Sequence, residues 1–291
     1  MTTIGFIGLG IMGAPMSEHL IAAGHQVAGF SLGEEWGPRL SKAGGRVAAD
    51  IADAVADADV VITMLPNHPE VEDAVLGEKG VLASVRPGTL LIDMSTIRPE
   101  SSIAVAAAAA ERDIRVLDAP VSGGEAGAKQ ASLSIMVGGT AEDFAAALPV
   151  LEKVGKTIVH VGPHGAGQTV KAANQLVVAG TYALVSEAIV LLEASGVDAK
   201  AGLDVLAGGL AASRILDLKR DSMLARQFTP GFRIDLHHKD MGIATAAARS
   251  ADVALPVTGL IAQLMAAARS MGFGSLDHSA LLKVIEALSG R

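Results

Sequence analysis

The chain has no cysteine and very few aromatic residues: only 3% of its 291 residues are Phe, Trp or Tyr. The absence of cysteine excludes disulfides, cysteine-ligated metals and thiol nucleophiles, and it suits a reducing compartment. Basic residues are also scarce, and the formal net charge is -8. Because phosphate groups are neutralised by clustered Lys and Arg, this charge argues against a nucleic-acid or anionic-membrane partner.

Apolar runs long enough to span a membrane are missing as well. No charge-free run of about 18 or more strongly apolar residues indicates a membrane span, and Met1 leads directly into the first expected strand, which leaves no room for a signal peptide. We therefore expect a cytoplasmic protein without a membrane partner. At 291 residues the chain exceeds the usual single-domain size, so two domains are expected.

A glycine-rich turn opens the chain. Gly8, Gly10 and Gly13 follow an apolar, strand-like run and precede an amphipathic segment at 16–23, which is the context of the dinucleotide-binding fingerprint. The first glycine permits the tight turn, the second lets the backbone approach a pyrophosphate, and the third lets helix and strand pack closely. A turn with no ligand is the alternative. The cofactor-binding residues expected here are Gly8, Leu9, Gly10, Ile11, Met12 and Gly13.

The pattern of the chain changes near residue 163. Before it, short Val/Ile-rich runs alternate with helical patterns, which predicts an α/β domain at 1–163 with a mainly parallel sheet. After it, a nearly unbroken apolar helix extends to about residue 195, and such a helix is expected to be buried on all sides as the axis of an all-helical domain at 164–291. The expected strands are at 26–30, 59–64, 89–93, 115–117, 133–137 and 157–161. The expected later helices are at 198–208, 213–225, 236–250, 256–269 and 278–288.

Candidate binding residues follow the strands, because ligands of open parallel sheets bind outside the carboxyl ends. One group follows the strand at 59–64 and a second follows the strand at 89–93: Met64, Leu65, Pro66, Ser95 and Thr96. A third group, Ser122, Gly123 and Gly124, offers a hydroxyl and backbone N–H groups that suit a small carboxylate. A tight turn with a capping serine is the alternative for this third group.

Lys171 is the most unusual single residue, because it lies in the first turns of the apolar helix. A buried ammonium is costly unless it reaches a cleft, a partner or water. A lysine that extends to the surface at the domain boundary is the alternative. Asn174 and Gln175 follow at the spacing that shares its face of the helix. Lys239 and Asp240 lie in a later helix, where a surface ion pair is the simpler interpretation.

Four segments together resemble the signatures of the β-hydroxyacid dehydrogenase family, in the right order and spacing over essentially the whole chain. They are residues 5–13, 118–124, 165–175 and 239–240. The resemblance implies a Rossmann-type dinucleotide-binding domain that a long helix joins to an all-α domain. It also implies homodimers or homotetramers that assemble through the second domain, and no metal.

The resemblance implies a role for each matching residue on the substrate side. Lys171 would be the general acid that protonates the carbonyl oxygen of the substrate during hydride transfer. The segment Ser122–Gly124 would hold the carboxylate of the substrate, Asn174 would orient the substrate, and Gln175 would reach its far hydroxyl. Ser95, Thr96 and Lys239 would line the cofactor side, with Asp240 holding Lys239.

The resemblance also favours a substrate. The Lys-Ala-Ala-Asn-Gln form at 171–175, together with the segments 208–216, 230–237 and 276–281, favours reduction of tartronate semialdehyde, a small semialdehyde acid, to D-glycerate. The sister 3-hydroxyisobutyrate dehydrogenases usually carry Asn-Asn at 174–175, and such an enzyme, or a glyoxylate or succinic semialdehyde reductase, is the alternative. Imine reductases share the fold but generally lack the lysine. A non-catalytic dinucleotide sensor would have lost Lys171 or the Ser122–Gly124 segment.

The choice between NAD and NADP depends on Ser31, at the end of the second strand. NAD-preferring folds place an acidic residue there, which repels a 2′-phosphate. The Asn-Arg pattern of NADP enzymes is absent too. Glu34 and Glu35 would oppose a phosphate, whereas Arg39 and Lys42 would attract it. Because the repelling carboxylate is missing at Ser31, we expect a preference for NADP.

Overall fold

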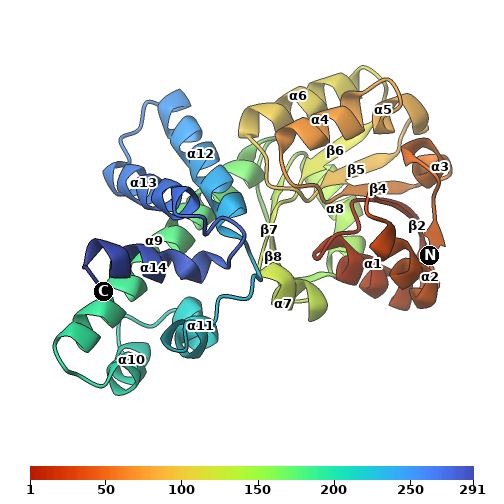
Figure 1. Ribbon diagram of the computed structural model, residues 1–291. Helices are drawn as coiled ribbons and strands as arrows, with labels where there is room; N and C mark the ends of the chain where they lie inside the picture. Colours follow the sequence, from red (N-terminus) through yellow and green to blue (C-terminus); the bar gives the residue numbers. More distant parts are fainter. The chain divides into compact units, whose positions relative to one another are not determined.

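The computed structural model describes residues 1–291 except for the side chain of Glu34. It forms two compact units, Met1–Lys171 and Ala172–Arg291. The first contains a nine-stranded sheet with helices, and the second is helical (Figure 1). Helix α9, Ala166–Ala194, begins in the first unit and continues as the first helix of the second. The predicted fold class is confirmed, whereas the predicted boundary after residue 163 stays a prediction.

The sheet is mainly parallel, as predicted. Its strands run in the order β3-β2-β1-β4-β5-β6-β8-β7, and β9 pairs with β8. The pairs from β3 to β6 are parallel, while β8 is antiparallel to β6 and β7. The strands are β1 Thr3–Ile7, β2 Gln26–Phe30, β3 Arg46–Val47, β4 Val60–Thr63, β5 Leu90–Asp93, β6 Arg115–Asp118, β7 Val121–Ser122, β8 Leu133–Gly138 and β9 Gly155–Gly162. Strands β3 and β7 are absent from the sequence prediction because two residues are too short to show a period of two.

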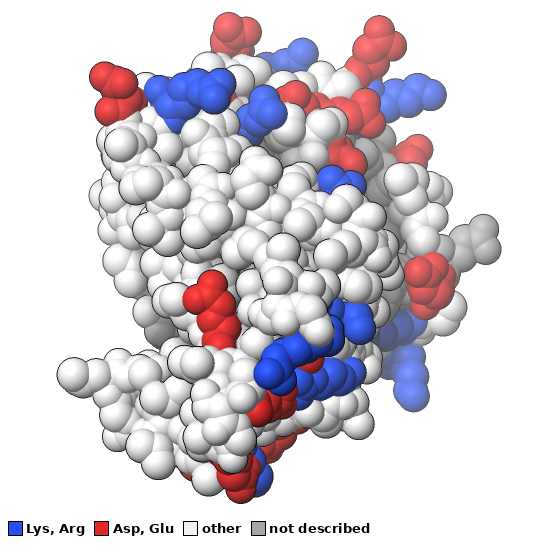
Figure 2. Space-filling model, turned by 60° about the vertical axis from the view of Figure 1, so that its left-hand side comes forward, with Lys and Arg blue, Asp and Glu red and all other residues white. Residues whose placement is uncertain are grey.

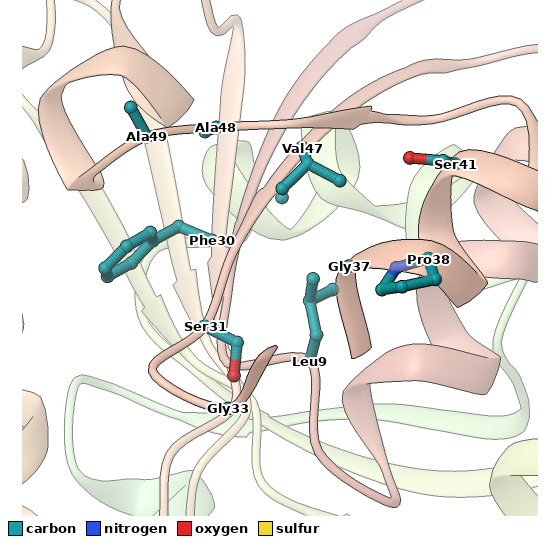
Figure 3. Close-up of a pocket in the computed structure, with 11 residues that line it drawn as sticks. Leu9, Phe30, Ser31, Gly33, Gly37, Pro38, Ser41, Val47, Ala48 and Ala49 are labelled. Atoms are coloured by element: carbon teal, nitrogen blue, oxygen red, sulfur yellow. The ribbon is translucent and has the colours of Figure 1, made fainter. Parts of the chain in front are cut away.

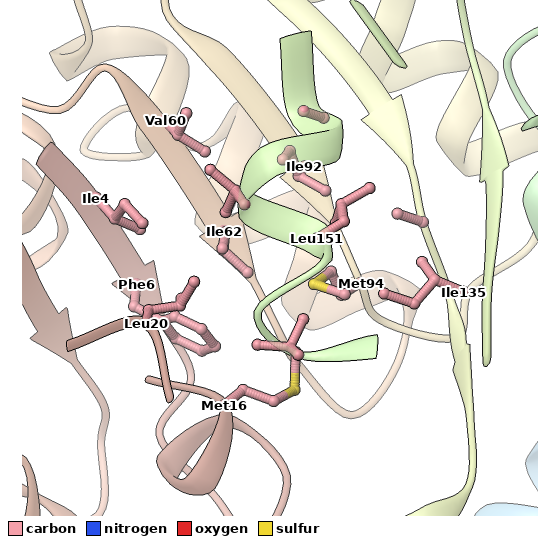
Figure 4. Packing of buried hydrophobic residues seen from close by; sticks show 14 of the residues in the cluster. Ile4, Phe6, Met16, Leu20, Val60, Ile62, Ile92, Met94, Ile135 and Leu151 are labelled. Atoms are coloured by element: carbon pink, nitrogen blue, oxygen red, sulfur yellow. The ribbon is translucent and has the colours of Figure 1, made fainter. Parts of the chain in front are cut away.

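Helices cover both faces of this sheet. They are α1 Gly13–Ala22, α2 Gly37–Ala43, α3 Ile51–Val55, α4 His68–Leu76, α5 Val81–Ser84, α6 Pro99–Ala110, α7 Gly124–Lys129 and α8 Ala141–Leu151, with a 3₁₀ turn at Glu34–Trp36. Successive side chains of a strand point to opposite faces, so a strand covered on both faces is apolar throughout. On one face Phe6, Ile62 and Ile92 pack with Met16 of α1 and Leu151 of α8 (Figure 4).

The opposite face has its own apolar cluster. Its strand residues are the neighbours of those on the first face, and they meet helices α3 to α6: Ile7, Val61, Leu91, Val55, Val71, Val81 and Val105. The two clusters hold β1, β4 and β5 between two helical layers. The carboxyl ends of these strands therefore form one rigid edge of the sheet.

The second unit packs around α9. Its other helices are α10 Ala199–Ala207, α11 Arg214–Leu224, α12 Ile234–Ser250, α13 Pro256–Ser270 and α14 Leu281–Leu288, with a 3₁₀ turn at His278–Ala280. Tyr182 and Ile189 of α9 share one core with Met241 of α12, Met265 of α13 and Leu281 of α14. Among the described residues α9 is the one helix long and apolar enough to cross a membrane. Its buried face is instead part of the core of this unit.

One face of α9 contradicts the sequence analysis. Val177, Leu184 and Leu191 are 62%, 68% and 67% exposed, so the expectation that the helix is buried on all sides is wrong. These residues are separated by two helical turns and form one apolar stripe. A continuous apolar sequence does not distinguish a helix buried by its own chain from one that keeps an apolar face at the surface.

Candidate active site

The glycine-rich turn lies where the strand order reverses between β1 and β4, the position at which open α/β sheets bind ligands. Gly8 has a φ of +99°, and a Cβ there would lie 2.4 Å from the carbonyl oxygen of Met64. A Cβ on Gly13 would lie 1.9 Å from the carbonyl oxygen of Gly8. In contrast, a Cβ on Gly10 would meet nothing within 4 Å. Gly8 and Gly13 are therefore required by packing, and Gly10 leaves the turn open in front of α1, as a pyrophosphate requires.

The loops that follow β4 and β5 are tied together by Ser95. The backbone N–H of Leu65 donates to Ser95 Oγ at 2.9 Å, and Ser95 is fully buried. Two of the predicted cofactor-binding segments, Met64–Pro66 and Ser95–Thr96, are thus neighbours at the same edge of the sheet. The hydroxyl of Ser95 positions the loop after β4. Its contact with a cofactor stays a prediction.

A pocket of about 440 Å³ lies at the carboxyl end of β2 (Figure 3). Ser31 follows β2 directly and lines this pocket, as does Leu9 of the glycine-rich turn. Among the residues whose side chains the structure describes, none that lines the pocket is ionisable: they are Leu9, Gly29, Phe30, Ser31, Gly33, Gly37, Pro38, Ser41, Val47, Ala48 and Ala49. The placement of Ser31 beside the dinucleotide turn is what an adenosine ribose site requires.

Of the charged residues that bear on the cofactor choice, Arg39 already has a partner. Arg39 donates from Nε and Nη2 to the carboxylate of Glu18, at 2.5 and 2.8 Å, and this ion pair lowers the pKa of Glu18. The carboxylate of Glu35 lies close to Gly33, since a Cβ on Gly33 would be 2.9 Å from its Oε2. Arg39 is therefore engaged elsewhere, and the expected preference for NADP depends on Ser31. The side chain of Glu34 lies outside the described residues.

The segment Ser122–Gly124 turns from β7 into α7. Gly123 and Gly124 have φ values of +132° and +59°, which residues other than glycine rarely adopt. The N-cap of α7 is Gly123, and no side chain caps this helix. The alternative in which Ser122 caps the following helix therefore does not apply. A Cβ on Gly124 would meet nothing within 4 Å, so the backbone at this turn is open to a ligand.

Asp118 and Gln168 hold the first turn of α9 against the sheet. Asp118, at the end of β6, accepts hydrogen bonds from the backbone N–H groups of Gly165 at 2.8 Å and Gln168 at 3.0 Å. The side chain of Gln168, which is fully buried, donates to the carbonyl oxygen of Ser95 and accepts from the N–H of Ile97. The start of α9 is thus fixed to the ends of both β5 and β6.

Lys171 follows this anchored turn and is only 6% exposed. Asp118 and Gln168 fall in two of the segments that carry the family resemblance, 118–124 and 165–175, but no role was predicted for either residue. A glutamine three residues before the lysine, in an otherwise apolar helix, was the available signal, because a buried amide requires partners. The structure shows that the two motifs meet: the residue that opens the segment 118–124 anchors the helix that carries Lys171.

Burial raises the pKa of Asp118 to about 6, and the negative charge of Asp93 acts in the same direction. The N–H groups of Gly165 and Gln168 lower it and only partly compensate. The carboxyl group therefore binds a proton more tightly in the folded protein than in the unfolded chain.

This difference predicts a pH dependence of stability. Between about pH 4 and pH 6 the unfolded chain has lost the proton of Asp118 and the folded protein retains it, so the free energy of unfolding falls as the pH rises, by about 3 kcal/mol for this group. Urea unfolding at several pH values is expected to show this fall in the parent and not in Asp118→Asn. The exposed Asp57→Asn serves as the control and is expected to follow the parent. Parallel curves for the parent and Asp118→Asn would contradict the assignment.

In the second unit, α12 brings Lys239 and Asp240 to α9. Gln175 Nε2 donates to Asp240 Oδ2 at 2.5 Å, and Asn174 Nδ2 donates to Gln175 Oε1 at 2.8 Å. Lys239 Nζ lies 3.0 Å from Asp240 Oδ1, as an ion pair without the geometry of a directed hydrogen bond. Asp240 is 1% exposed. The interpretation as a surface ion pair is therefore wrong for Asp240. The sequence alone could not show that this residue of α12 packs against α9.

The predicted site residues divide between the two units. The first unit contains the glycine turn, the loops after β4 and β5, Ser31, Ser122–Gly124 and Lys171. Asn174, Gln175, Lys239 and Asp240 belong to the second. Lys171 and Asn174 are one turn apart on α9. Among the described residues no group of His, Asp or Glu forms a metal site.

A pocket beside an open glycine turn, at the strand-order reversal of a mainly parallel sheet, defines a dinucleotide-binding protein. Residues 3–162 match the family profile described as the NAD-binding domain of 6-phosphogluconate dehydrogenase. Residues 165–285 match the profile described as NAD-binding of NADP-dependent 3-hydroxyisobutyrate dehydrogenase. The chain is 40% identical to 2-hydroxy-3-oxopropionate reductase of Escherichia coli (strain K12), over 98% of both chains.

The similar solved structures include two that match over nearly the whole chain. The 3-hydroxyisobutyrate dehydrogenase of Mycobacterium tuberculosis with L-serine has a TM-score of 0.88 and 38% identity, covering 98% of this chain and 99% of the other. Psf3 in complex with NADP⁺ and 2-OPP has a TM-score of 0.89 and 27% identity, covering 97% and 99%. The chain belongs to the β-hydroxyacid dehydrogenase family. It is an NAD(P)-dependent oxidoreductase of small hydroxy or oxo acids.

Proposed function

We propose that this enzyme uses NAD(P)H to reduce a small semialdehyde acid, with tartronate semialdehyde the favoured substrate and D-glycerate the product. The observation that carries the proposal is the placement of Lys171, a buried lysine on a helix whose first turn Asp118 and Gln168 fix to the ends of β5 and β6. The similarity to the Escherichia coli reductase supports the choice of substrate.

Each site residue has a separate role in the proposed reduction. NAD(P)H, held at the turn Gly8–Gly13, supplies the hydride when it is bound. Lys171 donates a proton to the aldehyde oxygen, so that the carbonyl becomes a hydroxyl, and it accepts that proton in the reverse direction. The Ser122 hydroxyl and the N–H groups of Gly123 and Gly124 hold the carboxylate of the substrate. Asn174 orients the substrate one turn beyond the lysine.

Steady-state kinetics test the proposal. Tartronate, methylmalonate and succinic semialdehydes and glyoxylate are compared, each with NADH and with NADPH. The highest kcat/KM is expected for tartronate semialdehyde. If methylmalonate semialdehyde is preferred instead, the enzyme is a 3-hydroxyisobutyrate dehydrogenase. No turnover of any of them, with cofactor bound, would support a dinucleotide sensor, and turnover of cyclic imines alone would support an imine reductase.

Ser122 has a predicted effect of its own. Ser122→Ala is expected to raise the KM for semialdehyde acids, because one of the hydrogen bonds to the substrate carboxylate is lost. The loss of a hydrogen bond to a charged group costs about 1.5–3 kcal/mol, so the KM is expected to rise by roughly ten- to a hundredfold. Propanal, which lacks the carboxylate, serves as the control and is expected to be a poor substrate for both proteins. Equal efficiency of the parent on aldehydes with and without a carboxylate would contradict an anion site at Ser122–Gly124.

We propose NADP as the preferred cofactor, supported by the serine at position 31, which lines the pocket at the end of β2 together with other uncharged residues among those described. A homodimer or homotetramer is proposed as well, supported by the exposed apolar stripe of α9. On the face shown in Figure 2, several Lys and Arg side chains lie next to one another, with Asp and Glu side chains at their edges. The formal net charge of -8 supports a protein without a nucleic-acid partner. The cytoplasmic location stays a prediction.

A further inference from the structure

The side chains of Asn174, Gln175 and Asp240 form a chain of hydrogen bonds with a defined direction. A carboxylate only accepts hydrogen bonds, so Asp240 Oδ2 fixes Gln175 with its Nε2 toward α12, at 2.5 Å. The Oε1 of Gln175 then faces Asn174 and requires a donor, which fixes the Nδ2 of Asn174 toward Gln175, at 2.8 Å. The orientation of both amides thus follows from one buried charge.

The backbone of the same helical turn is held by a second contact. His237 of α12 is fully buried, and its Nε2 lies 3.1 Å from the carbonyl oxygen of Gln175. Because a carbonyl oxygen only accepts, this nitrogen carries the proton. The Nδ1 atoms of His237 and His278 lie 3.0 Å apart. Helix α12 therefore holds Gln175 by its main chain as well as by its side chain.

The length of the side chain at position 175 determines whether this link exists. Asparagine is shorter than glutamine by one methylene group, about 1.5 Å of bond length. A contact of 2.5 Å lengthened by that amount exceeds the 2.7–3.2 Å typical of an N–H···O hydrogen bond. A glutamine reaches Asp240 where an asparagine at the same position falls short.

We propose that Gln175 is a positioning residue: it transmits the charge of Asp240 to Asn174 and thereby sets which amide atoms Asn174 presents to the substrate. The proposal rests on the proposed function, in which Asn174 orients the semialdehyde acid. It assigns to Gln175 no direct contact with the far hydroxyl of the substrate. Asn174 keeps its Oδ1 and one N–H for that purpose.

A length exchange tests the link. Gln175→Asn shortens one partner, Asp240→Glu lengthens the other, and the double variant restores the distance between them. Gln175→Asn is expected to lower kcat/KM by roughly ten- to a hundredfold, the effect of losing a hydrogen bond to a charged group. The double variant is expected to recover most of that loss. Gln263→Asn, the same substitution on the exposed face of α13, controls for the lower helix propensity of asparagine.

The choice of substrate separates positioning from direct contact. Tartronate semialdehyde carries a hydroxyl group where methylmalonate semialdehyde carries a methyl group. If Gln175 acts through Asn174, Gln175→Asn lowers kcat/KM by the same factor for both. A loss confined to tartronate semialdehyde, without recovery in the double variant, would overturn the proposal and show direct contact. A parent that reduces neither aldehyde would instead contradict the proposed function.

Urea unfolding measures the link without any turnover. Each single variant is expected to lower the midpoint of unfolding. The double variant is expected to lower it by less than the two single decreases added together, since the effects of substitutions in one hydrogen-bond network are not additive. Additive losses would show that no coupling exists between positions 175 and 240, and the proposal would fall whatever the substrate.

Discussion

Replacement of Lys171 by alanine is expected to lower kcat by roughly two to four orders of magnitude, the usual scale of a positioned general acid. The side chain is buried in the second turn of a helix that is fixed to the sheet, so a water molecule or another amine has no equivalent position. The Kd of the cofactor, measured by fluorescence titration, is expected to stay nearly unchanged, because Lys171 is not among the residues that line the pocket at Ser31.

Two further variants make this test specific. Lys171→Met keeps the length of the apolar stem and is expected to lose as much activity as Lys171→Ala. Lys171→Arg is not expected to recover activity, since a guanidinium stays protonated near neutral pH and is a poor proton donor there. A variant without the lysine that kept most of the parental kcat would show that the proton comes from elsewhere.

The second large effect is expected at Ser31. Ser31→Asp places a carboxylate in the pocket at the end of β2, where it accepts from the ribose hydroxyl of NADH and repels the 2′-phosphate of NADPH. Repulsion of like charges costs a few kcal/mol and each 1.4 kcal/mol is about tenfold, so kcat/KM with NADPH is expected to fall by roughly ten- to a thousandfold. The efficiency with NADH is expected to hold or improve.

The ratio of kcat/KM for the two cofactors is the measured quantity, in the parent, in Ser31→Asp and in a control. Ser195→Asp introduces the same charge at an exposed position outside the pocket lining and is expected to leave the ratio unchanged. The same ratio in the parent and Ser31→Asp would mean that Ser31 does not face the adenosine ribose. The preference for NADP would then lose the support of Ser31, and Arg39 is already paired with Glu18.

Local pattern was sufficient for the architecture of the first unit. Runs of Val and Ile buried on both faces predict parallel strands wherever they are long enough, and six of them are observed close to the predicted ranges. The glycine turn was equally predictable, because the positive φ of Gly8 and the contact of Gly13 with the carbonyl oxygen of Gly8 are both local features of the turn. Gly8 has a φ of +99°, and a Cβ on Gly13 would lie 1.9 Å from the carbonyl oxygen of Gly8, so glycine is required at both positions.

The sequence by itself determined the class of fold, the position of the dinucleotide turn, the isolated Lys171 and the order of the motifs, because each depends on residues a few positions apart. Tertiary structure alone decided the exposure of one face of α9 and the engagement of Arg39 by Glu18. It also decided the anchoring of α9 by Asp118 and the direction of the hydrogen bonds from Asp240 to Asn174. Each of these depends on which elements distant in the chain do or do not pack together, and a periodic pattern records only whether a side chain is apolar, not which distant group it meets.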